Sequence, residues 1–430
     1  MTTAHRRPPG RLRTVLHGSG FLAVCIVVMN VATYGFQIVA ARLLGPEQYG
    51  GVASMMALLL VVGVLQLGLQ AAAARQVSAE PERSRAIERL MLTVTYRSSA
   101  AVGVLMLVLS PVVWRLLRLD SLIPALLVAV CAVPLTIVGG QAGILQGERR
   151  WLELAVVYLA LGLPRVAVGT LCMVLRPTEA AAMAGVAAAQ FAPALVGWWV
   201  LRRRRTARQP VTGLRAAVTE TLHSSFALLG FFVLSNVDIV IARNVLSDRA
   251  SGLYAGGLIL TKAVLFLPQF VVVVAFPSLS TAGERRRSLL LSLAAVGGCG
   301  LVSMLGAWLL SPVAMIFIGG SDYTAVQHRL WLFAVLGTVL AVLQLLVYSV
   351  LARQHRSSAY LIWGAVALLI GLGVTMRSLD ALLVTVAAVD AALMLALLGL
   401  SLWHLREDAV GPSDRTEQAV GAPAPVESRH

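Results

Sequence analysis

Long runs of apolar residues, separated by short charged segments, cover most of the 430-residue chain. A helix needs roughly 20 apolar residues to cross a hydrocarbon core about 30 Å thick. Twelve runs reach this length, and each predicts a transmembrane helix. The first half of the chain holds the runs 19–41, 50–74, 92–114, 121–144, 152–175 and 180–201. The second half holds the runs 221–244, 252–277, 288–310, 329–351, 359–376 and 380–404. The pattern therefore predicts an all-α integral membrane protein.

The composition excludes a soluble protein. Hydrophobic residues make up 58% of the chain and charged residues only 13%, whereas an ordinary globular protein has about 25% charged residues. Arg6, Arg7, Arg11 and Arg13 precede the first apolar run in the manner of a signal peptide. That run continues to about Val39 and further spans follow, so we expect an uncleaved first helix.

The distribution of the charges predicts the topology. The chain carries a formal charge of +15, and Lys262 is its only lysine. With a cytoplasmic N-terminus, the inner segments hold 24 arginines and the outer loops hold 8. This positive-inside distribution predicts that both termini are cytoplasmic. The basic run 202–205 is then expected to meet anionic membrane lipids rather than nucleic acid.

The basic segment divides the chain into two halves of six spans. We expect a cytoplasmic N-terminus and two lobes, then a basic cytoplasmic linker between them and a disordered cytoplasmic tail. The N-terminus covers 1–18, the N-lobe 19–201, the linker 202–220, the C-lobe 221–404 and the tail 405–430. Leu214, Val218 and Leu222 recur every four residues, which suggests a helix on the membrane surface within 213–222.

Because each half has an even number of spans, the halves are expected to be parallel repeats. Both share a short pattern. Ala41-Arg42 closes the first span before Tyr49, and Ala242-Arg243 closes the seventh before Tyr254. Glycines also recur every four residues. They are Gly139, Gly143 and Gly147 in one span, and Gly252 and Gly256 in another. Small residues at this spacing predict close packing of helix backbones.

The sequence contains no hydrolase GxSxG, Walker or HExxH motif. Its four cysteines lie in apolar runs without CxxC spacing, so neither a metal site nor a disulfide is expected. The outer loops are short and lack paired carboxylates. We therefore expect a secondary transporter without cofactors, and no enzymatic activity.

Charged residues inside the spans are the candidate functional residues, since a charge at the bilayer centre costs about 2.5–3.5 kcal/mol. Arg165 and Lys262 fall near the midplane, and both are expected to bind a phosphate group in a central cavity. Arg97 lies closer to the cytoplasmic side and is a weaker candidate, because it can reach the interface. Asp238 and Asp390 are candidates for ion coupling. For Asp238 and Lys262, a structural ion pair is an equally good explanation.

Uncharged polar residues form stripes on the first two spans. Asn30, Tyr34 and Gln37 share one face of the first span, and Gln66 and Gln70 share one face of the second. These residues either line the cavity and contact the glycan, or hydrogen-bond to neighbouring helices. Both interpretations remain open from the sequence.

Three segments resemble a known family. Residues 42–50 (RLLGPEQYG) resemble the first outer loop of bacterial polysaccharide and O-antigen flippases, which transport lipid-linked oligosaccharides. These belong to the multidrug/oligosaccharidyl-lipid/polysaccharide exporter superfamily. Residues 65–69 and the turn 145–151 are also similar to the corresponding segments of this family, and 236–254 fit its pattern more loosely. The resemblance covers roughly residues 15–405.

The resemblance implies about twelve transmembrane helices, arranged as two six-helix lobes that form a V around a central cavity. It implies that the protein flips a polyprenyl-pyrophosphate-linked oligosaccharide across the bacterial cytoplasmic membrane by alternating access. A glycan polymerase and glycosyltransferases would then be partners. The resemblance assigns no binding residues.

Two other functions remain open. A cation-coupled multidrug extruder of the same superfamily would use a buried carboxylate. A non-transporting scaffold for glycan-assembly enzymes would tolerate neutralisation of the midplane cations.

Overall fold

The computed structural model describes residues 10–202, 214–275, 285–351 and 356–409, and every element in these ranges is helical. Nine helices of this part of the chain are long and apolar enough to span a membrane. One of them, α1 (Gly10–Ala79), holds two of the predicted runs. The runs 252–277 and 359–376 fall on two further helices. The chain is a multi-pass membrane protein with an all-α fold, as predicted.

Helix α1 contains a sharp break at its centre. Gly45 has φ 70° and ψ 172°, which no helix contains, and Pro46 begins the second arm. Glycine reaches this backbone conformation without a steric penalty. Proline is favoured at the first position of a helix, where no intrahelical N–H bond is lost. The turn predicted over 42–49 is therefore a break at one residue, and both arms are longer than the apolar runs.

The other helices follow in chain order. The N-terminal half continues with η1 (Pro81–Arg83), α2 (Ser84–Leu116), α3 (Leu122–Gly147), α4 (Trp151–Leu175) and α5 (Glu179–Arg202). The C-terminal half holds α6 (Leu214–Val245), α7 (Asp248–Ala275), α8 (Arg285–Leu309), α9 (Ser311–Ile318), η4 (Ser321–Arg329), α10 (Leu330–Leu351), α11 (Arg356–Gly373) and α12 (Leu379–Ala409).

Three boundaries differ from the prediction. Residues 214–222, expected as a separate surface helix, are the first part of α6. Helix α12 continues through 405–409, the beginning of the predicted tail, and 410–430 lie outside the described residues. The loop predicted after the ninth span contains α9 and η4. Both are too short for a hydropathy pattern to separate them from the spans beside them.

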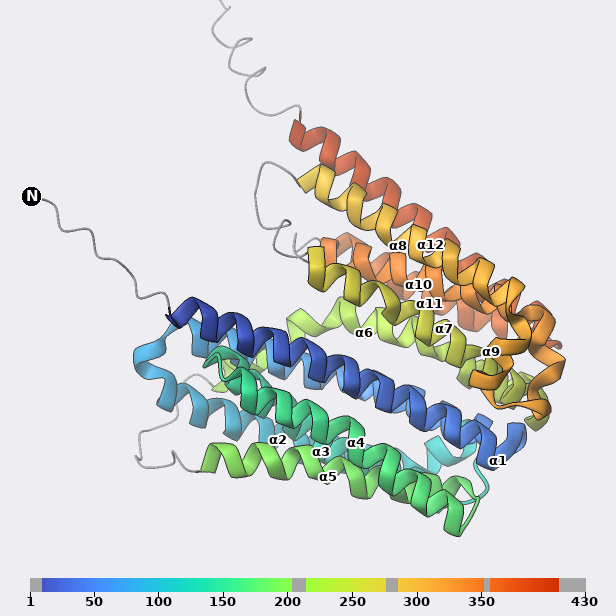
Figure 1. The fold of residues 1–430 in the computed structure, drawn as a ribbon, viewed down its shortest axis with the longest axis horizontal. Helices are drawn as coiled ribbons and strands as arrows, with labels where there is room; N and C mark the ends of the chain where they lie inside the picture. Colours follow the sequence, from blue (N-terminus) through green and yellow to red (C-terminus); the bar gives the residue numbers. More distant parts are fainter. Residues whose placement is uncertain (1–9, 203–213, 276–284, 352–355, 410–430) are drawn as a thin grey trace, which may run out of the picture.

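The helices form two groups (Figure 1). We call α1–α5 the N-lobe and α6–α12 the C-lobe. The lobes lie closer together at the end with the break in α1 and α9 than at the end with the N-terminus. We name these the outer end and the inner end, after the predicted topology. The two arms of α1 pack against α6 and α7, so this helix forms most of the contact between the lobes.

Glycines bring helices into direct contact. A Cβ atom at Gly139 or Gly143 of α3 would collide with the main chain of α1 at Gln66 or Gln70. At Gly256 of α7 it would collide with the ring of Tyr323. The close packing predicted from the glycine spacing is therefore confirmed.

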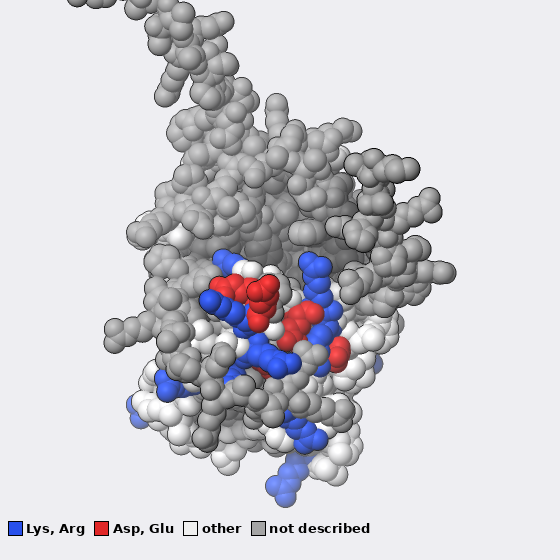
Figure 2. Space-filling view, turned by 90° about the vertical axis from the view of Figure 1, so that its left-hand side faces the viewer, with Lys and Arg blue, Asp and Glu red and all other residues white. Residues whose placement is uncertain are grey.

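The inner end carries charges of both signs. Figure 2 shows Lys and Arg side chains interspersed with Asp and Glu in the middle of this face. Arg83 pairs with Glu80 at 3.5 Å. Arg150 pairs with Glu148 at 3.3 Å and Glu153 at 3.1 Å. Such exposed or half-exposed pairs add little stability, so their importance here is to neutralise part of the positive charge.

Candidate functional site

A cluster of buried polar side chains lies within the C-lobe, beside its contact with α1. Three helices of this lobe contribute, and every member is less than 10% exposed. Helix α6 supplies Ser235, Asn236 and Asp238, α7 supplies Tyr254 and Lys262, and α12 supplies Asp390. We call these six residues the C-lobe cluster.

Lys262 joins this cluster to the N-lobe. Its Nζ donates hydrogen bonds to the carbonyl of Ser235 and, at 3.1 Å, to Oδ1 of Asn236. Its own carbonyl accepts a hydrogen bond from the hydroxyl of Tyr34 in α1, at 3.0 Å. The ammonium group therefore belongs to the C-lobe, while the main chain at this position touches the other lobe.

The two carboxylates of the cluster are incompletely bonded. Tyr254 donates to Oδ2 of Asp238 at 2.9 Å. Oδ1 of Asp238 and both oxygens of Asp390 are buried without a hydrogen-bond partner. Unpaired buried charges are costly, so a proton or a bound cation would stabilise this group.

The structure refines the predicted pair of Asp238 and Lys262. The charges of Asp238, Asp390 and Lys262 act on one another. The Lys262 ammonium, however, forms its hydrogen bonds with Ser235 and Asn236, and it makes no ion pair within 4 Å with either aspartate. The structure therefore shows no direct ion pair between Lys262 and either aspartate.

Arg165 lies apart from this cluster, inside the N-lobe. Its Nη2 donates to Oε1 of Gln190 in α5 at 2.9 Å, and its Nε is buried without a partner. Cys131 of α3 lies near the guanidinium group. Arg165 therefore faces the space between α3, α4 and α5, with part of its hydrogen-bonding capacity unused.

The uncharged candidates have different surroundings. Gln70 donates from Nε2 to Gln146 and Tyr158, both at 2.9 Å, and so joins α1 to α3 and α4. Oε1 of Gln37 accepts from the hydroxyl of Tyr49 at 3.4 Å. Asn30 and Gln66 are half-buried on α1. For Gln70 the structure favours a helix-to-helix contact over an exposed cavity position.

Arg97 stands on an exposed apolar face of α2. Val104 and Val108, seven and eleven residues further on, are 62% and 68% exposed and lie on the same side of the helix. A guanidinium at this position can extend toward the membrane surface.

The Ala-Arg…Tyr pattern shared by the two halves corresponds to a hydrogen bond that occurs once in each half and that was not predicted from the sequence. Gln37 and Asp238 each stand five residues before the arginine that closes their span, Arg42 and Arg243. Each accepts a hydrogen bond from the buried tyrosine at the start of the next span, Tyr49 or Tyr254. The Ala-Arg…Tyr similarity was the available signal for Tyr254.

Among the described residues, no group of three or more His, Cys, Asp or Glu side chains is arranged to hold a metal ion. The buried polar side chains described above carry ammonium, guanidinium, carboxylate and amide groups. Such groups can bind anions, exchange protons or bind a monovalent cation.

Comparison with known proteins identifies the family and the fold of the chain. Residues 15–283 match the family described as "Polysaccharide biosynthesis protein". No curated protein matches the chain. An inward-facing multidrug resistance MATE family transporter of the MOP superfamily is 13% identical, with a TM-score of 0.67 over 89% of this chain and 95% of that chain.

Two further solved structures have the same fold. A MOP superfamily transporter from Pyrococcus furiosus is 13% identical, with a TM-score of 0.64 over 93% of this chain and 96% of that chain. An outward-facing MATE family transporter is 13% identical, with a TM-score of 0.56 over 90% and 96%. The chain thus belongs to the polysaccharide biosynthesis protein family, and its fold is that of the MATE transporters of the MOP superfamily.

Proposed function

We propose that this protein is a flippase that moves a polyprenyl-pyrophosphate-linked oligosaccharide from the inner to the outer leaflet of the bacterial cytoplasmic membrane. The flipped glycan would then serve cell-surface polysaccharide biosynthesis. The family match supports polysaccharide chemistry, and the MATE-like fold supports export by alternating access of two lobes. The arginine distribution supports cytoplasmic termini, which makes the inner end the side of loading.

The physical problem is the head group of the substrate. A sugar cannot enter hydrocarbon alone, since its hydroxyl groups would lose their hydrogen bonds to water. The pyrophosphate needs cations along the path. An inside-negative potential then favours its outward movement by about 2.3 kcal/mol per charge per 100 mV.

One observation carries the proposal at the level of residues: the only lysine of the chain is buried where the two lobes meet. Lys262 takes part in the contact with α1 through its carbonyl, and its ammonium has two neutral acceptors. A phosphate oxygen that replaced these acceptors would form a stronger, charge-assisted bond. Arg165 would offer a second cation in the N-lobe.

The proposal is tested in a strain that lacks the protein. We expect lipid-linked oligosaccharide to accumulate on the inner leaflet and surface glycan to disappear. The native chain and Arg85→Gln, which changes an exposed cation of α2, should restore the glycan, whereas Lys262→Ala should not. Full restoration by Lys262→Ala at normal membrane levels would remove Lys262 from the mechanism and favour a scaffold.

A cation-coupled multidrug extruder is the second candidate, and the C-lobe carboxylates favour it. Asp238 and Asp390 hold three buried oxygens without hydrogen-bond partners, which suits a coupling proton or cation. If deletion changes drug sensitivity and leaves both surface glycan and lipid-linked intermediates unchanged, the extruder is correct and the flippase is not.

A further inference from the structure

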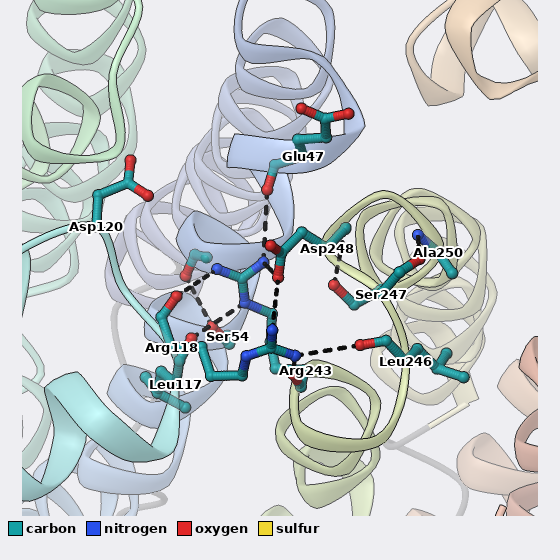
Figure 3. Close-up of polar contacts among 12 residues, drawn as sticks. Glu47, Ser54, Leu117, Arg118, Asp120, Arg243, Leu246, Ser247, Asp248 and Ala250 are labelled. Carbon is teal, nitrogen blue, oxygen red and sulfur yellow. Dashed lines mark hydrogen bonds and ion pairs between the residues drawn. The ribbon is translucent and has the colours of Figure 1, made fainter. Parts of the chain in front are cut away.

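We infer that Arg243 is the centre of an outer gate, which holds the two lobes together at their outer end and must come apart before the transporter opens outward. The inference rests on the proposed alternating-access function. Arg243 lies at the end of α6, is 2% exposed and contacts three separate segments of the N-lobe (Figure 3).

Arg243 and Arg118 form a reciprocal contact between the lobes. Nη2 of Arg243 donates to the carbonyl of Arg118 at 2.8 Å, and Nη1 of Arg118 donates to the carbonyl of Arg243 at 3.0 Å. Nε of Arg243 also donates to the carbonyl of Leu117 at 3.0 Å. Arg118 has a φ of 47°, which is uncommon outside glycine. This conformation ends α2, because the amides of Arg118 and Leu119 bond back to the carbonyls of Arg115 and Trp114, a common arrangement at helix C-termini.

Two acidic residues complete the gate with ion pairs across the boundary. Arg243 Nη2 lies 3.5 Å from Oε1 of Glu179, and Arg118 Nη2 lies 3.6 Å from Oδ1 of Asp248. Each lobe thus supplies one arginine and one carboxylate. The Arg243 and Glu179 side chains are 3% and 1% exposed, so water cannot screen this pair while the lobes are together.

The sequence just before Glu179 and Asp248 fixes the position of both carboxylates. At the start of α5, the Thr178 hydroxyl accepts a hydrogen bond from the amide of Ala181. At the start of α7, the Ser247 hydroxyl accepts one from the amide of Ala250. Each is a helix N-cap. Glu179 and Asp248 therefore stand in the first turn of their helices, where the helix dipole favours a negative charge.

The other half of the pseudo-repeat makes a matching contact. Arg42 closes the first arm of α1 as Arg243 closes α6. Its Nη2 donates to the carbonyl of Ile316 in α9, on the opposite lobe. Tyr323 of η4 adds a hydrogen bond from its hydroxyl to the carbonyl of Ala41 at 3.3 Å. In each lobe, the arginine at the end of the first span therefore contacts the segment that follows the third span of the other lobe.

Between these contacts the main chains of the two lobes touch. A Cβ atom on Gly252 would collide with the carbonyl of Pro46, and one on Gly50 would lie 3.2 Å from the amide nitrogen of Gly252. This closed surface lies beside the hydrogen bonds and ion pairs described above. When the lobes part, water can satisfy every donor and acceptor that the contact releases, so the gate can open and close reversibly.

The test measures opening directly, without substrate. Ser251 is fully buried at the lobe contact, beside Gly50. Ser251→Cys, in a chain whose native cysteines are replaced by alanine, is exposed to a membrane-impermeant maleimide from the outside. We expect slow labelling in this chain and several-fold faster labelling once Glu179→Gln weakens the gate.

The matched control is Asp380→Asn, which removes an ion pair with Arg329 at the same end but within the C-lobe. It should leave the labelling rate of Ser251→Cys unchanged. Equal labelling rates for the Glu179→Gln and Asp380→Asn variants would overturn the gate. Should Glu179→Gln reduce membrane levels, Arg243→Lys, which keeps the charge and loses the forked donors, should also accelerate labelling.

A second measurement uses Arg118→Cys with Asp248→Cys and a short reducible cross-linker. Cross-linking should stop the transport that the reduced double variant retains, and reduction should return transport to that level. Transport by the cross-linked protein would show that this end need not open. If Glu179→Gln accelerates the labelling of Ser251→Cys although the native chain exports no glycan, the gate is supported and the proposed substrate is rejected. If Glu179→Gln leaves the labelling rate unchanged while the native chain exports glycan, the gate is rejected and the proposed substrate is supported.

Discussion

The hydroxyl of Tyr34 in the N-lobe donates a hydrogen bond to the main-chain carbonyl of Lys262 in the C-lobe, at 3.0 Å. This bond joins α1 to α7, eight residues before Arg42 in α1 and 14 residues after Asp248 in α7. It exists only while the two helices touch. The residue with the clearest potential to bind phosphate is therefore also a point where the relative position of the lobes can be sensed.

Tyr34→Phe removes this bond and keeps the ring. Since a net hydrogen bond contributes about 0.5–1.5 kcal/mol, we expect the ratio of lobe-closed to lobe-open molecules to fall by roughly a factor of 2–10. Distances between spin labels on α1 and α7 would report the change. Val31→Ala, on an exposed part of α1, is the control. Unchanged distances would mean that the bond does not hold the lobes.

Lys262→Met should lower the stability of the fold as well as impair transport. It leaves Asp238 and Asp390 without the nearby cation. It also removes the donor of the Ser235 carbonyl and of Asn236 Oδ1. A buried polar group left without its partner costs about 1–3 kcal/mol. Adding Asp390→Asn should recover much of the loss, because it removes one of the uncompensated charges. Thermal unfolding in detergent checks both changes. If the losses of the two single variants simply add, the charges are not coupled.

Arg165→Ala, at normal membrane levels, should abolish glycan export. The partner of Arg165 offers a way to separate binding from packing. Gln190→Ala deletes the acceptor at 2.9 Å but keeps the guanidinium, so export should fall by less than in Arg165→Ala. A ligand role is wrong if both variants lose export equally, since Arg165 would then serve only to hold α4 against α5.

Gly252→Ala should prevent full closure of the outer end, because the new Cβ would meet the carbonyl of Pro46. Overpacking of this kind costs about 1–3 kcal/mol. We expect a lower unfolding temperature and faster maleimide labelling of Ser251→Cys. Gly298→Ala on α8 is the matched control, since nothing lies near its Cβ position. Equal behaviour of the two variants would show that the outer ends are not in tight contact.

The hydropathy pattern was sufficient to place the helices, because apolar length decides what can cross a bilayer. It also identified Arg165 and Lys262 as unusual. It could not assign their neighbours. Depth along a helix follows from counting residues, whereas rotation and tilt depend on packing. The depth estimate therefore placed Asp238 within reach of Lys262 but missed Asn236 and the carbonyl of Ser235 as its partners.

The outer gate was hidden for a related reason. Arg118 and Arg243 lie at the outer ends of predicted spans, where the topology alone is enough to explain an arginine. Glu179 lies far from both in the chain. Only the approach of the lobes brings these residues together. The repeated Ala-Arg…Tyr pattern marked the segment, yet an arginine at the end of a span carries no indication of which lobe it contacts.

The two halves differ at one chemically decisive position. Where the N-lobe presents the amide of Gln37 to Tyr49, the C-lobe presents the carboxylate of Asp238 to Tyr254. An amide cannot take up a proton near neutral pH, and a carboxylate can. Only one of these two contacts therefore includes an ionisable acceptor. Any ion exchanged at this contact would load in the C-lobe alone, which limits the stoichiometry at this position to one ion per transport cycle.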